Sequence, residues 1–195
     1  PYRLACDEVV ERGWLGFRIT GPNGEQCNDG LVRRLQPDVK MVLDVMATLE
    51  LPAIESLPPE MAREFMAASS AASPTGPAVG EIVDGTFPGA DGDDLEYRLY
   101  RPATDGPHPV VVYFHGGGWV LGDHQSDDPF CRDLCVRSNA LIVSCNYRHG
   151  PEHRFPAAPH DAFAALQWVS DHAAELGGVP GGVVVAGWSA GANLA

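Results

Sequence analysis

The sequence predicts an α/β fold, a mostly parallel sheet flanked by helices, on two observations. The first is a set of three apolar runs rich in β-branched residues: Val110–Phe114, Ala140–Cys145 and Val183–Ala186. Continuous runs of this kind are typical of strands that are buried on both faces of a parallel sheet. The second is that helical patterns separate them, near residues 127–138 and 158–174. Alternating strands and helices predict right-handed crossovers between parallel strands.

Further elements are predicted ahead of these runs. Residues 94–101 alternate between apolar and polar, with Leu95, Tyr97 and Leu99 on one face, which indicates a half-buried strand. Two amphipathic helices precede this strand. The apolar residues of the first recur at three- and four-residue steps: Val39, Val42, Leu43, Met46 and Leu49. The second runs from about residue 59 to 72, and the Pro-, Gly- and Ser-rich residues 73–80 are typical of a linker.

Composition and charge narrow the classes of partner. The chain has 195 residues, 45% of them hydrophobic, and a formal net charge of −13. This hydrophobic fraction is typical of a globular domain, and the negative charge disfavours binding to nucleic acid or to an anionic membrane. No stretch reaches the roughly 18 apolar residues of a membrane-spanning helix. The N-terminus lacks the apolar core of a signal peptide, so the predicted location is cytoplasmic.

The cysteines also favour an intracellular location. There are five in the chain, an odd number without a dense framework, which favours reduced thiols in an intracellular protein. Cys131 and Cys135 are four residues apart and could form half of a metal clip. No His or Cys pair follows at the spacing of a zinc site, so we interpret both as small residues that face the core. The sequence predicts neither a metal site nor a cofactor.

A serine motif follows the third apolar run. Gly187-Trp188-Ser189-Ala190-Gly191 matches the pattern G-x-S-x-G and opens an apolar, helix-compatible run. A serine between a strand and a helix is the context of a nucleophile elbow, in which the serine sits on a strained turn and flanking glycines avoid collisions. We therefore predict that Ser189 is a nucleophile. An ordinary structural turn is the alternative.

A glycine-rich motif follows the first apolar run. His115-Gly116-Gly117-Gly118-Trp119 comes directly after Val110–Phe114. Three glycines let the backbone approach a substrate closely, so their N–H groups can point at an oxyanion. Binding of a phosphate group is the alternative, but no Lys-Ser or Lys-Thr follows the glycines. We predict that Gly116–Gly118 and Ala190 form an oxyanion hole, supported by His115, Trp119, Gly187 and Gly191.

The two motifs together resemble the hormone-sensitive-lipase-like family of carboxylesterases, which have the α/β-hydrolase fold. Between them the family carries a stretch of the form Tyr-Arg…Pro-Glu-His…Phe-Pro-Ala-Ala, which here is Tyr147–Ala158. The resemblance covers roughly residues 35–195 and includes the family's N-terminal helical cap. It implies the hydrolysis of small or medium acyl esters. The tryptophans of the two motifs, Trp119 and Trp188, suggest an apolar substrate pocket.

Two positions depart from the family pattern, and part of the catalytic triad is missing. His149-Gly150 stands where the family usually has Leu-Ala, and Trp188 where it has Asp or Glu. In α/β-hydrolases the order of the triad is Ser, then Asp or Glu, then His. All seven histidines of this chain precede Ser189, so we expect the acid and the base beyond residue 195. The chain alone is then expected to be inactive, and its fold to be truncated after the elbow.

The predicted organisation has three parts. Residues 1–34 form an irregular N-terminal extension, residues 35–80 the helical cap and linker, and residues 81–195 the first, incomplete part of the hydrolase domain. The predicted function is hydrolysis of a small-molecule carboxylic ester by Ser189. The alternative is a receptor-like module on the same fold that binds a small molecule without catalysis. An Asp and a His in the family's positions would favour the enzyme.

Overall fold

The computed structural model describes residues 3–5, 18–20, 41, 44–45, 48–49 and 54–195. They form two compact units, residues 1–58 and 59–195. In the first unit, strands β1 (Arg3–Ala5) and β2 (Arg18–Thr20) pair antiparallel. Strands of three residues are too short to show a period, so the sequence does not reveal them. The division at residues 34 and 80 stays a prediction.

The first predicted helix is described only in part. Met41, Asp44, Val45 and Thr48 are helical, whereas Val39, Val42, Leu43 and Met46 lie outside the described residues. A single 3₁₀ turn, η1 (Ile54–Ser56), follows.

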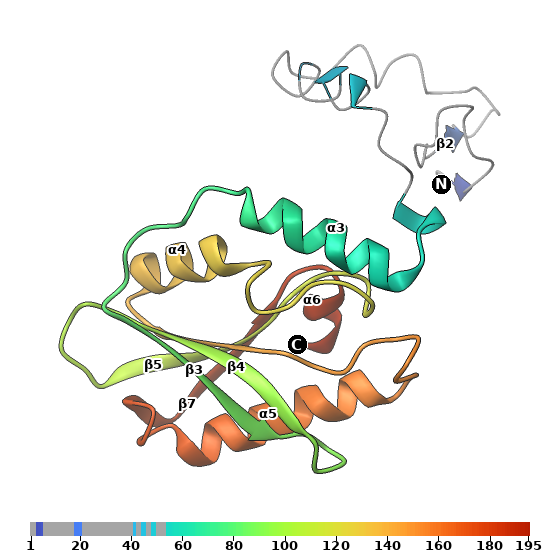
Figure 1. The fold of residues 1–195 in the computed structure, drawn as a ribbon. Helices are drawn as coiled ribbons and strands as arrows, with labels where there is room; N and C mark the ends of the chain where they lie inside the picture. Colours follow the sequence, from blue (N-terminus) through green and yellow to red (C-terminus); the bar gives the residue numbers. More distant parts are fainter. Residues whose placement is uncertain (1–2, 6–17, 21–40, 42–43, 46–47, 50–53) are drawn as a thin grey trace. The chain divides into compact units, whose positions relative to one another are not determined.

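The second unit is built on a five-stranded sheet (Figure 1). Its strands, in chain order, are β3 (Glu81–Pro88), β4 (Asp94–Arg101), β5 (His108–Phe114), β6 (Leu141–Cys145) and β7 (Gly178–Gly187). Their spatial order is β3-β4-β6-β5-β7. The pairs β6–β5 and β5–β7 are parallel, whereas β4 is antiparallel to both of its neighbours. The predicted α/β architecture is confirmed, and its first two strands make the sheet mixed.

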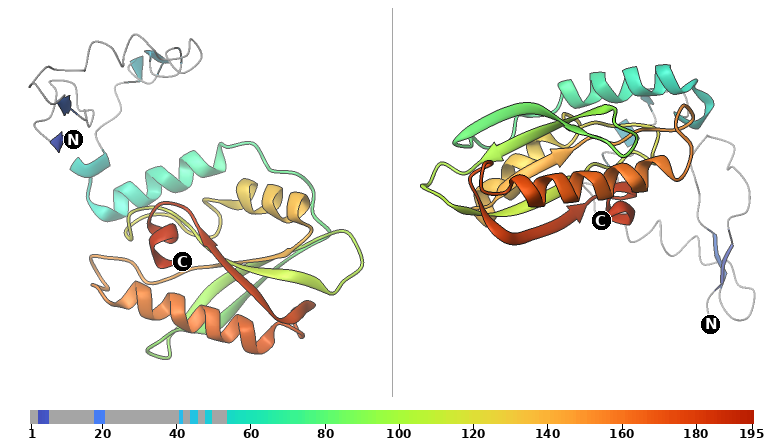
Figure 2. Two further views of the ribbon diagram at one scale, coloured as in Figure 1. Left: turned by 180° about the vertical axis from the view of Figure 1, so that it is seen from behind. Right: turned by 90° about the horizontal axis from the view of Figure 1, so that it is seen from below.

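Helices cover both faces of this sheet. They are α3 (Pro59–Ala71), α4 (Asp128–Ser138), α5 (Ala157–His172) and the short α6 (Ala190–Leu194). Figure 2 shows α3 and α4 over one face and α5 over the other. Every described boundary of the predicted helices lies within two residues of its prediction. In the part of the chain that the structure describes, no helix combines the length and the apolarity needed to cross a membrane.

Burial on both faces of the sheet explains why the sequences of the central strands are continuous apolar runs. Val110, Val112 and Phe114 of β5 pack in a core shared with α5, while Tyr113 points to the opposite core, shared with α4. Both faces of β5 are therefore covered. The expectation fails for the third apolar run, in the edge strand β7, where Val184 is 56% exposed. The second core also holds Cys131 and Cys135, both fully buried, which confirms that these cysteines face the core.

Strand β3 is an element that the sequence did not predict. Its pattern is interrupted by Gly85, which lies opposite Tyr97 of β4 in the register. A Cβ atom at Gly85 would lie 2.7 Å from the Tyr97 ring, so the aromatic ring takes the place of a side chain there. The partner strand supplies this contact, and no local period reveals it.

Candidate active site

The serine turn and the glycine loop leave neighbouring strands at the same edge of the sheet. In the parallel pair β5–β7, Phe114 lies opposite Gly187, and the Trp188 N–H donates to the Phe114 carbonyl at 3.2 Å. The carboxyl ends of parallel strands are where α/β sheets place their ligand sites. The order of the strands therefore brings residues 115–122 beside residues 187–191.

Ser189 occupies a strained turn between β7 and α6. Its φ of +51° and ψ of −114° lie in a region that non-glycine residues rarely adopt. The flanking glycines are required sterically. A Cβ atom at Gly187 would lie 2.3 Å from the backbone of Gly191, and one at Gly191 would lie 1.9 Å from the Phe114 carbonyl oxygen. Ser189 is exposed to solvent.

The glycine loop is equally unusual. Gly117, Gly118 and Trp119 have consecutive positive φ angles of 127°, 63° and 61°. The Gly117 carbonyl also accepts the Leu121 N–H at 2.9 Å, so the loop turns back on itself. Among the residues that the structure describes, no protein acceptor takes the N–H groups of Gly117, Gly118 or Ala190. These three groups remain available to a ligand.

Gly116 is the point where the loop meets the serine turn. A Cβ atom there would lie 2.7 Å from Trp188 Cδ1 and 3.4 Å from Ser189 Cβ. No side chain fits between the two segments, so the loop and the serine turn are in close contact at Gly116. The loop and Ser189, predicted to act together, are thus side by side.

His115 is buried beneath this loop. Its Nδ1–H donates to the Gly116 carbonyl at 2.7 Å, and its ring stacks on Tyr147 with centroids 4.5 Å apart. The Tyr147 hydroxyl donates to the His115 carbonyl at 2.9 Å. Burial lowers the pKa of His115, so the ring stays neutral at pH 7. These contacts support the bracing role that the sequence suggested. They show no hydrogen bond from Ser189 to an imidazole within the described part of the chain.

A buried carboxylate holds the neighbouring connection between β6 and α5. Asp161 of α5 is fully buried and accepts from Arg148 Nε at 2.7 Å and Nη2 at 2.9 Å. It also accepts the backbone N–H groups of Arg148 and Ala90. A buried charge is tolerated where its lone pairs are satisfied in this way. The network fixes Arg148, which lies between Tyr147 and His149 in the chain.

His149, one of the two departures from the family pattern, contacts the brace. Its ring stands edge-on to His115 and Tyr147, with centroids 5.3 Å and 5.0 Å apart. Burial is the largest cause that lowers the pKa of His149, to about 4, and electrostatic repulsion from the neighbouring His115 and Arg63 side chains lowers it further. The charges of Glu152 and Asp123 oppose this shift. The imidazole is therefore neutral in the folded protein at pH 7.

This pKa predicts a dependence of stability on pH. In the unfolded chain His149 binds a proton near pH 6.5, whereas in the fold it does so only near pH 4. The unfolded state binds more protons between these values, so stability must fall as the pH is lowered from 6.5 to 4. We expect the drop in Tm over this range to be smaller in His149→Leu, which carries the residue usual in the family. An equal drop in both proteins would contradict the prediction.

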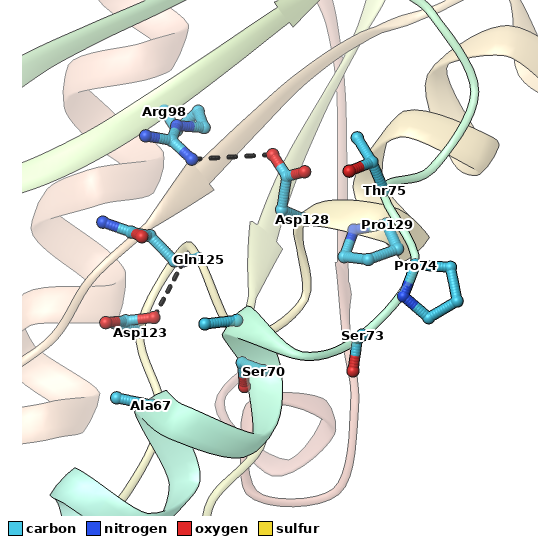
Figure 3. A pocket seen from close by; sticks show the side chains of 11 residues that line it. Ala67, Ser70, Ser73, Pro74, Thr75, Arg98, Asp123, Gln125, Asp128 and Pro129 are labelled. Atoms are coloured by element: carbon cyan, nitrogen blue, oxygen red, sulfur yellow. Dashed lines mark hydrogen bonds and ion pairs between the residues drawn. The ribbon is translucent and has the colours of Figure 1, made fainter.

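A separate cavity lies away from the serine. It has a volume of about 380 Å³ and lies between the end of α3, residues 73–75 and the start of α4 (Figure 3). Its charged groups already have partners: Arg98 pairs with Asp84 at 2.6 Å and with Asp128 at 3.5 Å. Asp123 accepts the Gln125 N–H at 2.8 Å. Neither Ser189 nor the glycine loop lines this cavity.

Comparison with known proteins agrees with this geometry. A family model described as α/β hydrolase fold matches residues 111–195. The carboxylic ester hydrolase LipN of Mycobacterium tuberculosis is 44% identical over 115 residues, which are 58% of this chain and 30% of that protein. The carboxylesterase NlhH of the same organism is 49% identical over 108 residues, 54% of this chain and 34% of that protein. The chain thus spans about a third of these curated relatives.

Solved structures of esterases share the fold. A hyperthermophilic esterase from Pyrobaculum calidifontis is 39% identical with a TM-score of 0.74, covering 83% of this chain and 51% of its own. An ester-hydrolase from the metagenome of Lake Arreo, complexed with a derivative of bipyridine phosphonate, is 32% identical with a TM-score of 0.77, covering 82% and 52%. The chain therefore has the α/β-hydrolase fold, and its resemblance to the hormone-sensitive-lipase-like carboxylesterases is confirmed.

Proposed function

We propose that the protein to which this chain belongs is a serine carboxylester hydrolase with Ser189 as its nucleophile. The observation that carries the proposal is the pairing of two strained segments. The serine at φ +51° adjoins a loop with three successive positive φ angles, the last of them at a residue with a Cβ atom, Trp119. Backbone strain held in two adjacent loops is typical of a functional site. Relatives named as carboxylesterases support the same chemistry.

The reaction follows the usual course of acyl transfer. Ser189 Oγ attacks the carbonyl carbon of the ester, and its proton passes to a histidine, which returns it to the leaving alkoxide. The resulting acyl-enzyme is hydrolysed by water. In α/β-hydrolases the histidine and its acidic partner come after the serine in the chain.

The glycine loop stabilises the charge of the tetrahedral intermediate. The N–H groups of Gly117 and Gly118 face no protein acceptor within the described residues, and the Ala190 N–H lies just past the nucleophile. Donors already fixed in position stabilise an oxyanion without reorganising as the charge develops. Gly116 contributes by its small size, since it lets the loop approach the serine.

Two exposed tryptophans favour an ester with a small or medium apolar acyl group. Trp119 ends the glycine loop, and Trp188 precedes the serine. Their exposed fractions are 43% and 67%. Both indoles can cover apolar parts of a substrate next to the reacting carbonyl.

A covalent probe tests the nucleophile directly. The complete protein should hydrolyse short-chain aryl esters, and an alkyl fluorophosphonate should label Ser189, identified by mass spectrometry of peptides. Labelling of another residue would sink the assignment. Saturable binding of esters with neither labelling nor turnover would instead support the receptor-like module.

A further inference from the structure

The conformation of the glycine loop needs support from outside the loop. Trp119 has a φ of +61°, which is unfavourable for a residue with a Cβ atom. The preceding glycines tolerate positive φ but gain no rigidity from it. His115 braces the start of the loop, at Gly116. The far end, at Trp119 and Val120, must be held by other groups.

The guanidinium of Arg63, on the cap helix α3, contacts the Trp119–Val120 end of the loop. Arg63 Nε donates to the Val120 carbonyl at 2.9 Å, and Nη2 donates to the Gly150 carbonyl at 2.9 Å. The Gly150 N–H in turn donates to the Trp119 carbonyl at 2.8 Å. Arg63 therefore bonds on both sides of the bridge that joins Trp119 to Gly150.

Glu152 fixes the plane of that guanidinium. It accepts from Arg63 Nη1 at 2.9 Å and from Nη2 at 2.7 Å, the two-pronged geometry in which arginine and carboxylate fit best. Hydrogen bonding to Arg63 is the largest cause that lowers the pKa of Glu152, to about 2, so the carboxylate stays charged at neutral pH. The side chains are 31% and 46% exposed, so the ion pair by itself stabilises little. Its effect is to orient the donors that reach Val120 and Gly150.

We infer that Arg63 is a positioning residue for the oxyanion loop: through Val120 and the Gly150–Trp119 bridge it holds the positive-φ segment that presents the Gly117 and Gly118 N–H groups. The inference rests on the proposed function of that loop. It makes the cap helix a support of the catalytic centre. Lysine cannot replace arginine there, because an ammonium lacks the planar fork that reaches several fixed acceptors at once.

The test uses the complete protein with Arg63→Met and Arg63→Lys. Loss of oxyanion positioning should lower kcat for an aryl acetate about tenfold in both variants, with KM within about twofold of wild type. In Arg63→Lys the charge beside Glu152 remains, so we expect Tm near that of wild type while kcat stays low. Arg137→Met is the matched control, since it breaks an exposed pair with Asp133 on α4. It should leave kcat unchanged.

Hydrogen exchange gives a readout that does not depend on activity. Backbone amides of residues 117–122 should exchange faster in both Arg63 variants and not in Arg137→Met. Unchanged exchange in this segment would overturn the inference. So would wild-type kcat together with wild-type Tm in Arg63→Lys, because that is the result expected if Arg63 only holds α3 in place. If the wild-type protein hydrolyses no ester, the exchange result still decides the inference, and the proposed function alone fails. If Arg63→Met does not fold, Arg63→Lys decides.

Discussion

Ser189→Ala is expected to lower kcat/KM for aryl esters by a factor of about 10⁴ or more in the complete protein, the scale of removing a serine nucleophile from a triad. Alanine keeps the turn and its neighbours but has no Oγ to form the acyl-enzyme. Stopped assays with an aryl acetate would measure the loss. Ser170→Ala, an exposed serine on α5, is the control and should retain full activity. Activity above a tenth of wild type in Ser189→Ala would rule out the nucleophile.

The same position also tests the strain. With a φ of +51° and a ψ of −114°, Ser189 lies in a sparsely populated backbone region, which costs a residue with a Cβ atom about 1–3 kcal/mol. Ser189→Gly should therefore be inactive yet have a higher free energy of unfolding than Ser189→Ala. Equal stability of the two variants would show that any strain in the turn is no larger than the roughly 1 kcal/mol by which glycine stabilises the unfolded chain.

Gly117→Val is expected to lower kcat by about 10²-fold or more, the scale of losing one oxyanion donor. A Cβ atom at this residue would lie 1.9 Å from the Leu121 carbonyl oxygen, and the φ of +127° excludes a β-branched side chain in any case. The contacted atom belongs to the backbone of Leu121 and cannot rotate away as a side chain could, so the loop must move. Because the moved N–H groups matter in the transition state, kcat should fall more than KM rises.

Gly92→Val is the matched control for this loss. Gly92 has a φ of +86°, and a Cβ atom there would have no neighbour within 4 Å, so valine brings backbone strain without a collision. It lies in the turn between β3 and β4, outside the serine site. We expect reduced stability and normal kcat. Near-normal turnover in Gly117→Val would reassign the glycine loop to a purely structural role.

Local patterns were sufficient for most of the fold. Burial on both faces left continuous apolar runs in β5 and β6, and burial on one face left the alternation of β4. The pair of motifs also located Ser189 and the glycine loop, because sharp turns beside a backbone require glycine wherever they occur. Strand β3 was missed, since Gly85 is covered by an aromatic ring from β4 and leaves no period of its own.

Other features depended on tertiary structure. The sequence could not show that β4 runs antiparallel to β6, or that Arg63 meets Val120, Gly150 and Glu152. Arg63 lies on an amphipathic helix, where a cation usually marks only a solvated face. Its three contacts lie 57, 87 and 89 residues away along the chain. Periodicity and turn preferences depend on residues that are close in the sequence, so the sequence shows them. The acceptors of a guanidinium come close to it only when the sheet has brought distant loops together.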